Sequence, residues 1–279
     1  MRQRMGVMGG IGLCMALLPQ GLVASQEKPQ GESPPTKPSV VERPIGEFRM
    51  VPVRVHLLRS PDAPAAGTKL TGEDIVRIFQ KANGIWHAAG VHLWVESVVE
   101  EKPATVAGHE SDKELPTEAL LPLRPGDSHP AGMFHVYYIG EMSPNGIFMR
   151  RDGIFVKESA RLRKVEGGID EPLPRVTAHE LGHGMSLPHR QDTFNLMASG
   201  TTGTGLNEAE IEAVRHAVFA FAWALTPEEF LKQADEIAAK GKKQEARSRY
   251  QAVIELPGDA PLKIQAQAHL KALQKEKGK

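Results

Sequence analysis

The sequence has almost no cysteine: Cys14 is the only one in 279 residues. It lies in an apolar stretch, residues 5–18, which follows two arginines and precedes small residues suited to cleavage. This pattern is typical of a signal peptide over residues 1–25, so we expect an exported protein, either secreted or periplasmic. Cleavage would remove Cys14, which excludes an internal disulfide and a thiol that silences a metal site. Lipid attachment at Cys14 is disfavoured, because Leu13 stands where a small residue is expected.

The sequence also lacks an excess of either charge and a long apolar run. Its 34 basic and 34 acidic residues give a formal net charge of zero. No electrostatic field would then attract phosphate, so we expect no nucleic acid partner. The apolar stretch near the N-terminus is too short to span a bilayer, so we expect no stable membrane span.

What the sequence does contain is the run HELGHGMSLPH, residues 179–189. On a helix, His179 and His183 lie one turn apart on the same face, where both imidazoles can bind one metal ion. Glu180, beside the first histidine, can take a proton from a zinc-activated water and pass it to a leaving amine. His189 can be a third ligand only if the chain bends, and Gly184 and Pro188 favour a bend between them.

This run resembles the active-site motif of metzincin zinc metallopeptidases, HExxHxxGxxH followed by a methionine-containing turn. The resemblance implies one catalytic Zn²⁺ bound by His179, His183 and His189, with Glu180 as the catalytic base. It also implies that Met197, in the sequence Asn-Leu-Met-Ala, lies beneath the metal.

Two positions depart from the family pattern. Ser186 replaces the family glycine, and a positive φ there would cost about 1–2 kcal/mol. Ser199 stands where some members have a metal-binding tyrosine, so no tyrosine ligand is expected.

A rival set of ligands comes from gluzincins, which take a glutamate from a second helix. Glu208 would then replace His189. Asn207 and Glu210, however, have the spacing of a capping box at the start of an apolar-periodic helix, which explains this segment without a metal. The metzincin spacing of His189 therefore favours the three-histidine site.

The remaining pattern predicts an α+β fold, and the resemblance implies a metzincin-like catalytic domain with a twisted mixed sheet over residues 47–225. A Pro-rich disordered linker over residues 26–46 precedes it. Alternating valines over 51–57 predict a first strand, with Pro52 at an edge or strand start. Capped by Thr71 and Asp74, a helix should run to Gly90. Further strands are expected over 91–98 and 133–139, and one or two more over 145–158. A zinc helix should begin at about Arg175. A last helix should begin at Asn207, with these residues facing inward: Ile211, Val214, Val218, Phe221 and Leu225.

Residues 226–279 are rich in charge and alanine and predict a small helical segment. Gly241, Ala246 and Tyr250 recur at spacings similar to a tetratricopeptide repeat. Such a segment either packs on the catalytic domain, which we favour, or recruits a protein partner.

These observations together predict an exported zinc endopeptidase acting on peptides or proteins. The segment 145–158 is the candidate edge strand for the substrate, and an ordinary hairpin explains it equally well. Substrate-binding residues and specificity do not follow from the sequence. The alternative is a weakly active or inactive zinc-stabilised module that uses its C-terminal helices to bind a partner. The other histidines show no second metal-binding spacing.

Overall fold

The computed structural model describes residues 43–150, 152–258 and 260–275. The predicted signal peptide and nearly all of the predicted linker lie outside these residues. The last predicted linker residues, 43–46, belong to the folded part: Ile45 is buried, and Arg43 Nε donates to the Ala88 carbonyl at 2.7 Å. The folded part therefore begins a few residues before the predicted boundary at 47.

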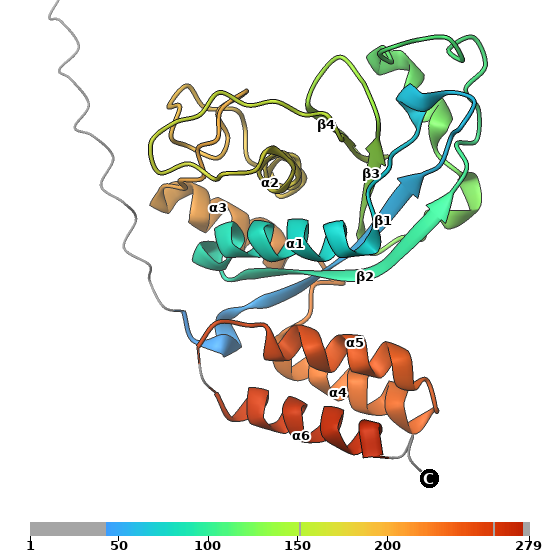
Figure 1. Ribbon diagram of the computed structural model, residues 1–279. Helices are drawn as coiled ribbons and strands as arrows, with labels where there is room; N and C mark the ends of the chain where they lie inside the picture. Colours follow the sequence, from blue (N-terminus) through green and yellow to red (C-terminus); the bar gives the residue numbers. More distant parts are fainter. Residues whose placement is uncertain (1–42, 151, 259, 276–279) are drawn as a thin grey trace, which may run out of the picture. The chain divides into compact units, whose positions relative to one another are not determined.

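A five-stranded sheet forms the centre of the fold, with strand order β2-β1-β3-β5-β4 (Figure 1). Its strands are β1 Arg49–Leu58, β2 Val91–Glu101, β3 Phe134–Ile139, β4 Gly146–Met149 and β5 Gly153–Lys157. All pairs are parallel except β4 with β5, which form an antiparallel hairpin. The predicted mixed sheet is thus present, mostly parallel, with β4 at one edge.

The expectation that Pro52 lies at a sheet edge or at a strand start is wrong, since β1 lies between β2 and β3 and begins at Arg49. Pairing of β1 with β3 begins only at Val53, however, while Pro52 is aligned with Trp94 of β2. An internal strand tolerates this proline because the side of the strand that would face β3 is not yet paired at Pro52.

Helices α1, Gly72–Trp86, and α2, Pro172–Gly184, lie over one face of the sheet (Figure 1). Helix α1 begins at the predicted Thr71–Asp74 capping box, and Gly90 follows its final turn at φ 69°. Helix α2 packs against α1 and against β4 and β5. The buried core between these helices and the sheet includes Val53, Val55, Trp86, Val136 and Leu181.

Helix α3, Glu208–Phe219, packs beside this core through Val214 and Val218. The prediction made this helix too long at its C-terminal end. The helix ends at Phe219, so Phe221 and Leu225 belong to the segment that follows, where Leu225 forms an isolated antiparallel bridge with Met50.

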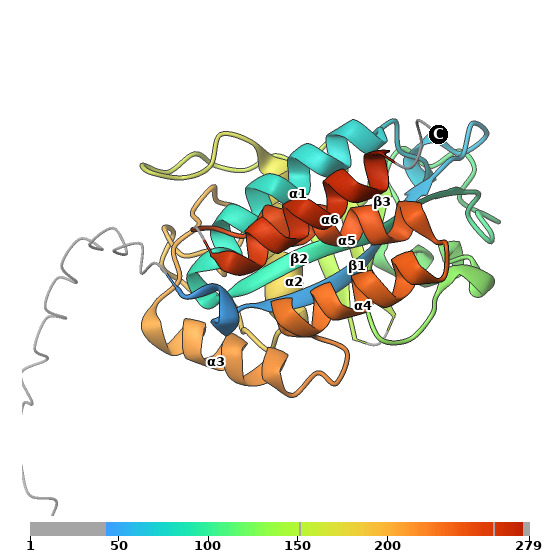
Figure 2. The same cartoon turned by 90° about the horizontal axis from the view of Figure 1, so that it is seen from below.

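The opposite face of the sheet carries α4 Pro227–Ala239, α5 Lys243–Ile254 and α6 Pro261–Lys275. Figure 2 shows these helices across β1 and β2. Phe230 of α4 meets Trp94 edge-on at 5.0 Å between ring centroids, and the Trp94 indole donates to Ser248 at 3.1 Å. The preferred prediction, that this segment packs on the rest of the chain, is confirmed; its likeness to a tetratricopeptide repeat stays a prediction.

Short 3-10 helices complete the described chain: Ile45–Glu47, Pro64–Ala66, His87–Ala89, Thr117–Ala119, Leu121–Leu123 and Gly126–Ser128. The last three belong to the long insertion between β2 and β3, which buries Leu115, Leu120 and Leu123 against Tyr137 and Phe155. Among the described residues, no helix has the length and apolar character needed to cross a bilayer.

Candidate metal centre

Helix α2 places the first two histidines at the centre of the molecule. It begins at Pro172 rather than near Arg175 as predicted, so Pro172 and Pro174 both lie in its first turn. Proline is compatible with this turn, because the first N–H groups of a helix have no intrahelical acceptor. His179 and His183 follow one turn apart, and the His179 side chain is almost fully buried.

After Gly184 the chain reverses through Ser186, the only non-glycine residue with positive φ (74°) among those the structure describes. The Leu187 amide donates to the Gly182 carbonyl at 2.9 Å and closes the turn. Ser186 therefore adopts the left-handed conformation that the family glycine would adopt more easily. This turn carries the chain back along the helix and brings His189 beside His183.

The three imidazoles converge on one point. Their ligand atoms all lie within 4.8 Å of one another, and His183 Nε2 is 3.2 Å from His189 Nε2. Tetrahedral zinc with Zn–N bonds of about 2.0–2.1 Å separates two nitrogen ligands by roughly 3.3 Å. The observed spacing of His183 and His189 fits such an ion.

Two of the rings are held by their other nitrogen. His179 Nδ1 bonds the Leu196 carbonyl and His183 Nδ1 bonds the Leu187 carbonyl, each at 2.8 Å. These bonds fix Nδ1 as the protonated nitrogen and leave Nε2 with its lone pair, which is the form that binds metal. Burial lowers the pKa of His179 to about 3 and also lowers that of His183, so both rings are neutral at pH 7. The donor set therefore suits a divalent zinc ion.

Glu180 lies next to these nitrogens, with its Oε1 4.0 Å from His179 Nε2. Burial raises the pKa of this carboxyl to about 7, opposed by the charge of Arg175 and by a hydrogen bond from the Phe148 amide. Strand β4 approaches very closely here. A Cβ on Gly146 would lie 2.6 Å from Val176 Cγ1 and 2.7 Å from Glu180 Oε1, so only glycine fits.

Met197 lies in the turn after the third histidine and is fully buried. Its Sδ would be 2.7 Å from a Cβ on Gly182, so the sulfur packs directly against the zinc helix. Asn195 Oδ1 accepts from the Met197 amide at 2.7 Å and tightens the turn. The buried methionine thus supports the helix segment between His179 and His183.

Arg175, one turn before His179, was considered in the sequence only as a helix start. Its side chain is buried and binds carbonyls of the following loop: Nε donates to Gly203 at 3.1 Å, and Nη2 donates to Leu196 at 2.6 Å and to Ala198. The Leu196 carbonyl also holds His179. The signal in the sequence was an arginine four residues before His179, a candidate metal ligand, on the same helical face.

Glu208 does not join the histidines: it is exposed at the start of α3, and the predicted Asn207–Glu210 capping box is present. Glu210 has a further role that sequence reasoning missed. Its buried carboxylate accepts from Arg190 Nε at 2.6 Å and from Asn195 Nδ2 at 2.7 Å. Glu210 therefore ties α3 to the residue after His189 and to the turn that contains Met197.

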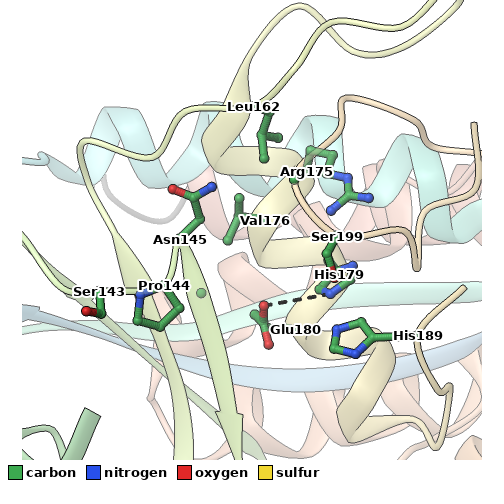
Figure 3. Close-up of a pocket in the computed structure, with 12 residues that line it drawn as sticks. Ser143, Pro144, Asn145, Leu162, Arg175, Val176, His179, Glu180, His189 and Ser199 are labelled. Carbon is green, nitrogen blue, oxygen red and sulfur yellow. Dashed lines mark ion pairs between the residues drawn. The ribbon is translucent and has the colours of Figure 1, made fainter. Parts of the chain in front are cut away.

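A cavity of about 410 Å³ opens beside the histidines (Figure 3). His179, Glu180 and His189 line one side of it, and Ser199 and Gly200 form another part of the wall. The start of the hairpin contributes Ser143, Pro144, Asn145 and Gly146, while α2 and the preceding segment contribute Arg175, Val176 and Leu162. In the part of the chain that the structure describes, these three histidines are the one cluster of three potential metal ligands.

Comparisons with known proteins give limited information. No family model matches the sequence, and no curated protein matches it either. Among solved structures, archaemetzincin from Methanopyrus kandleri is similar at 15% identity and a TM-score of 0.41, over 63% of this chain and 98% of that chain. This likeness is too weak to assign a function.

Proposed function

We propose that the protein is an exported zinc-dependent endopeptidase, with Zn²⁺ held by His179, His183 and His189. The observation that carries the proposal is the convergence of three imidazoles, within 4.8 Å of one another, beside the buried carboxylate of Glu180. The cavity beside them is open to a substrate and large enough for a side chain next to the scissile bond. Export rests on the sequence of residues 1–25.

Each residue has a defined part in peptide hydrolysis. Bound Zn²⁺ would polarise the substrate carbonyl and lower the pKa of a coordinated water to about 7. Glu180 would hold a water beside the histidines, take its proton as the peptide carbon is attacked, and deliver that proton to the leaving amine. The carbonyl bonds of His179 and His183 hold Nε2 of each ring toward the point where the imidazoles meet.

Strand β4 is the proposed docking edge for the substrate backbone. Among the described residues β4 pairs with β5 alone, so its other edge has no strand beside it; only the Phe148 amide on β4 is engaged, by Glu180 of α2. An extended peptide could pair with this edge antiparallel, while its side chains enter the cavity lined by Asn145 and Gly146. The close approach of Gly146 to Glu180 would bring the substrate backbone near the catalytic carboxylate.

The Glu180→Gln variant tests the proposal, because glutamine keeps the shape of the side chain but cannot take a proton. We expect it to keep one zinc per chain by metal analysis and to lose roughly 10²–10⁴-fold of casein cleavage. A chelator should abolish cleavage by the wild type. A Glu180→Gln protein that cuts casein at the wild-type rate would refute the role.

The second function, a zinc-stabilised binding module, predicts a different outcome of the same work. Chelation would then lower the unfolding temperature while no peptide in a library is cut. The partner would bind through α4–α6. If these helices are tetratricopeptide-like, one face of the repeat is left unburied by the chain itself, and helices of the partner would cover it.

A further inference from the structure

Arg175 is a buried cation in the wall of the cavity beside the metal centre. Only 2% of the residue is exposed, yet it lines the cavity together with Val176 and Ser199. In Figure 3 it lies on the far side of His179 and Ser199 from Glu180. The side chain therefore reaches a part of the cavity distinct from the point where the imidazoles meet.

The guanidinium is only partly satisfied by the protein. Nε and Nη2 donate to loop carbonyls, including Gly203 and Leu196. Nη1 has no hydrogen-bond partner among the residues that the structure describes, and it is not fully enclosed by protein atoms. Two N–H groups of a side chain that is otherwise bonded thus remain available at the cavity wall.

The charge of Arg175 is also uncompensated at close range. Within the described parts of the chain, Glu180 is the carboxylate that acts on this charge, and the two form no ion pair. Burial lowers the pKa of Arg175 to about 10, so the group remains cationic at pH 7. A buried arginine normally pairs with a carboxylate, whose two oxygens match the guanidinium fork.

We propose that Arg175 binds a carboxylate of the substrate through Nη1 and makes the cavity selective for an anionic group next to the scissile bond. Two sources supply this chemistry: an acidic side chain, or the C-terminal carboxylate of a short peptide. The cavity volume of about 410 Å³ accommodates either one. Leu162 and Val176 provide apolar contacts for the aliphatic part of a glutamate side chain. This inference rests on the proposed function, and it names the class of peptide that the proposed enzyme would cleave.

Matched peptides test the selectivity in the wild-type, zinc-loaded protein. A cleavable peptide identified from a library is made with Glu or Gln at each position flanking the cut, always with an amidated C-terminus. A second pair lacks acidic residues and ends in either a free carboxylate or an amide near the cut. We expect kcat/KM to be roughly ten- to a hundredfold higher for the carboxylate member of one pair, as for a charge-assisted hydrogen bond. The pair that responds identifies the source.

Variants assign the effect to Arg175. Arg175→Gln removes the charge, Arg175→Lys restores it without the fork, and Arg161→Gln removes an exposed charge beside the cavity residue Leu162. We expect Arg175→Gln to lose the carboxylate preference, Arg175→Lys to regain part of it, and Arg161→Gln to keep it. Zinc content and unfolding temperature are measured for each, because loss of the Arg175 bonds also loosens the loop that contains Leu196.

Binding of the same peptides to Glu180→Gln separates the inference from the proposed function. Fluorescence anisotropy should show tighter binding of the carboxylate member in the absence of cleavage. If the wild-type, zinc-loaded protein cuts no peptide but the carboxylate member still binds more tightly, the inference would stand and the peptidase proposal would fall. Cleavage with equal kcat/KM for both members, or a preference that survives Arg175→Gln, would overturn the inference while leaving the peptidase proposal intact. No binding and no cleavage would overturn both.

Discussion

Two groups of three histidines lie on opposite faces of the sheet. His179, His183 and His189 face one another on the side of α2. In the two that lie on the helix, Nδ1 donates to a carbonyl, and Nε2 keeps its lone pair and faces the other imidazoles. On the other face, His56, His129 and His135 are linked to their neighbours by both stacking and hydrogen bonds. A buried histidine can bind metal only if one ring nitrogen keeps its lone pair, and the hydrogen bonds of the ring decide whether it does.

In the second group, both ring nitrogens of His56 and of His135 are hydrogen-bonded. His56 Nδ1 is 2.5 Å from Glu101 Oε1, its Nε2 is 2.9 Å from His135 Nδ1, and His135 Nε2 is 2.8 Å from the Pro130 carbonyl. All three bonds need a proton, and a neutral chain supplies them if Glu101 is protonated and donates to His56. Burial raises the pKa of Glu101 and lowers those of both histidines, which favours this neutral arrangement. We therefore expect this group to stabilise the fold.

The largest expected difference between the groups is in metal binding. His183→Ala should lose stoichiometric zinc after dialysis and all measurable cleavage, because two imidazoles hold zinc far more weakly than three. The matched change His135→Ala should keep one zinc per chain. Metal analysis by mass spectrometry decides this, and zinc lost equally from both variants would abolish the distinction.

Stability should respond in the opposite sense. His56→Ala leaves the Glu101 carboxyl and His135 Nδ1 without their partner and opens a cavity, so we expect the free energy of unfolding to fall by about 2–4 kcal/mol. Denaturant unfolding in the presence of chelator measures this without a contribution from metal. His216→Ala, at an exposed position on α3, is the control and should change stability little. A small effect of His56→Ala would mean that the hydrogen-bonded chain contributes nothing.

Acid should weaken the fold through the same residues. The folded-state pKa values of His56 and His135 are lowered to about 3 and 4, so between pH 6.5 and 4 the unfolded chain binds more protons than the folded chain. The stability that these histidines contribute is present above pH 6.5 and is lost as pH falls, by roughly 1.4 kcal/mol per pH unit for each ring that stays neutral. Unfolding in chelator at pH 7 and pH 5 should give a shallower pH dependence for His56→Asn than for wild type; identical slopes would contradict the assignment.

The smallest effect concerns the turn that completes the first group. Ser186→Gly relieves the positive φ and should raise the free energy of unfolding by about 0.5–1 kcal/mol, since glycine adopts this conformation without penalty. Zinc content should be unchanged. Ser186→Ala keeps the Cβ and should not stabilise. A Ser186→Gly protein less stable than wild type would show that the serine side chain makes a compensating contribution.

The sequence predicts those parts of the fold that depend on local pattern. The strand around Val53 and the capping box of Thr71 follow from spacing within a few residues, and both are present. The resemblance to the metzincin pattern raised a positive φ at Ser186 only as a condition, and the structure shows it. Strand order does not follow, because parallel strands are joined by long crossovers that the pattern leaves open. The zinc-helix start was placed too late, since Pro172 and Pro174 were assigned outside a turn that accepts both.

The site shows the same division between local and tertiary information. Spacing alone puts His179, His183, Glu180 and His189 within reach of one another, and the structure brings their side chains together. Arg175 and Glu210 were not recognised as supports of the site, because their partners are carbonyls and side chains of a loop 15 to 28 residues away. Gly146 was missed for a related reason: only the packed hairpin reveals that a Cβ would meet Glu180.

The contact between the sheet and the C-terminal helices bears on how the protein folds. Phe48, Met50 and Trp94 belong to the first two strands and their approach, yet they are buried by Phe230, Leu231 and Tyr250 from the last quarter of the chain. A protein shortened at residue 225 would present this apolar surface to water, where it would favour aggregation. The three histidines of the candidate metal centre therefore lie on a part of the chain that does not cover its own sheet: synthesis must reach α5 before the strands beneath α2 are covered on both faces.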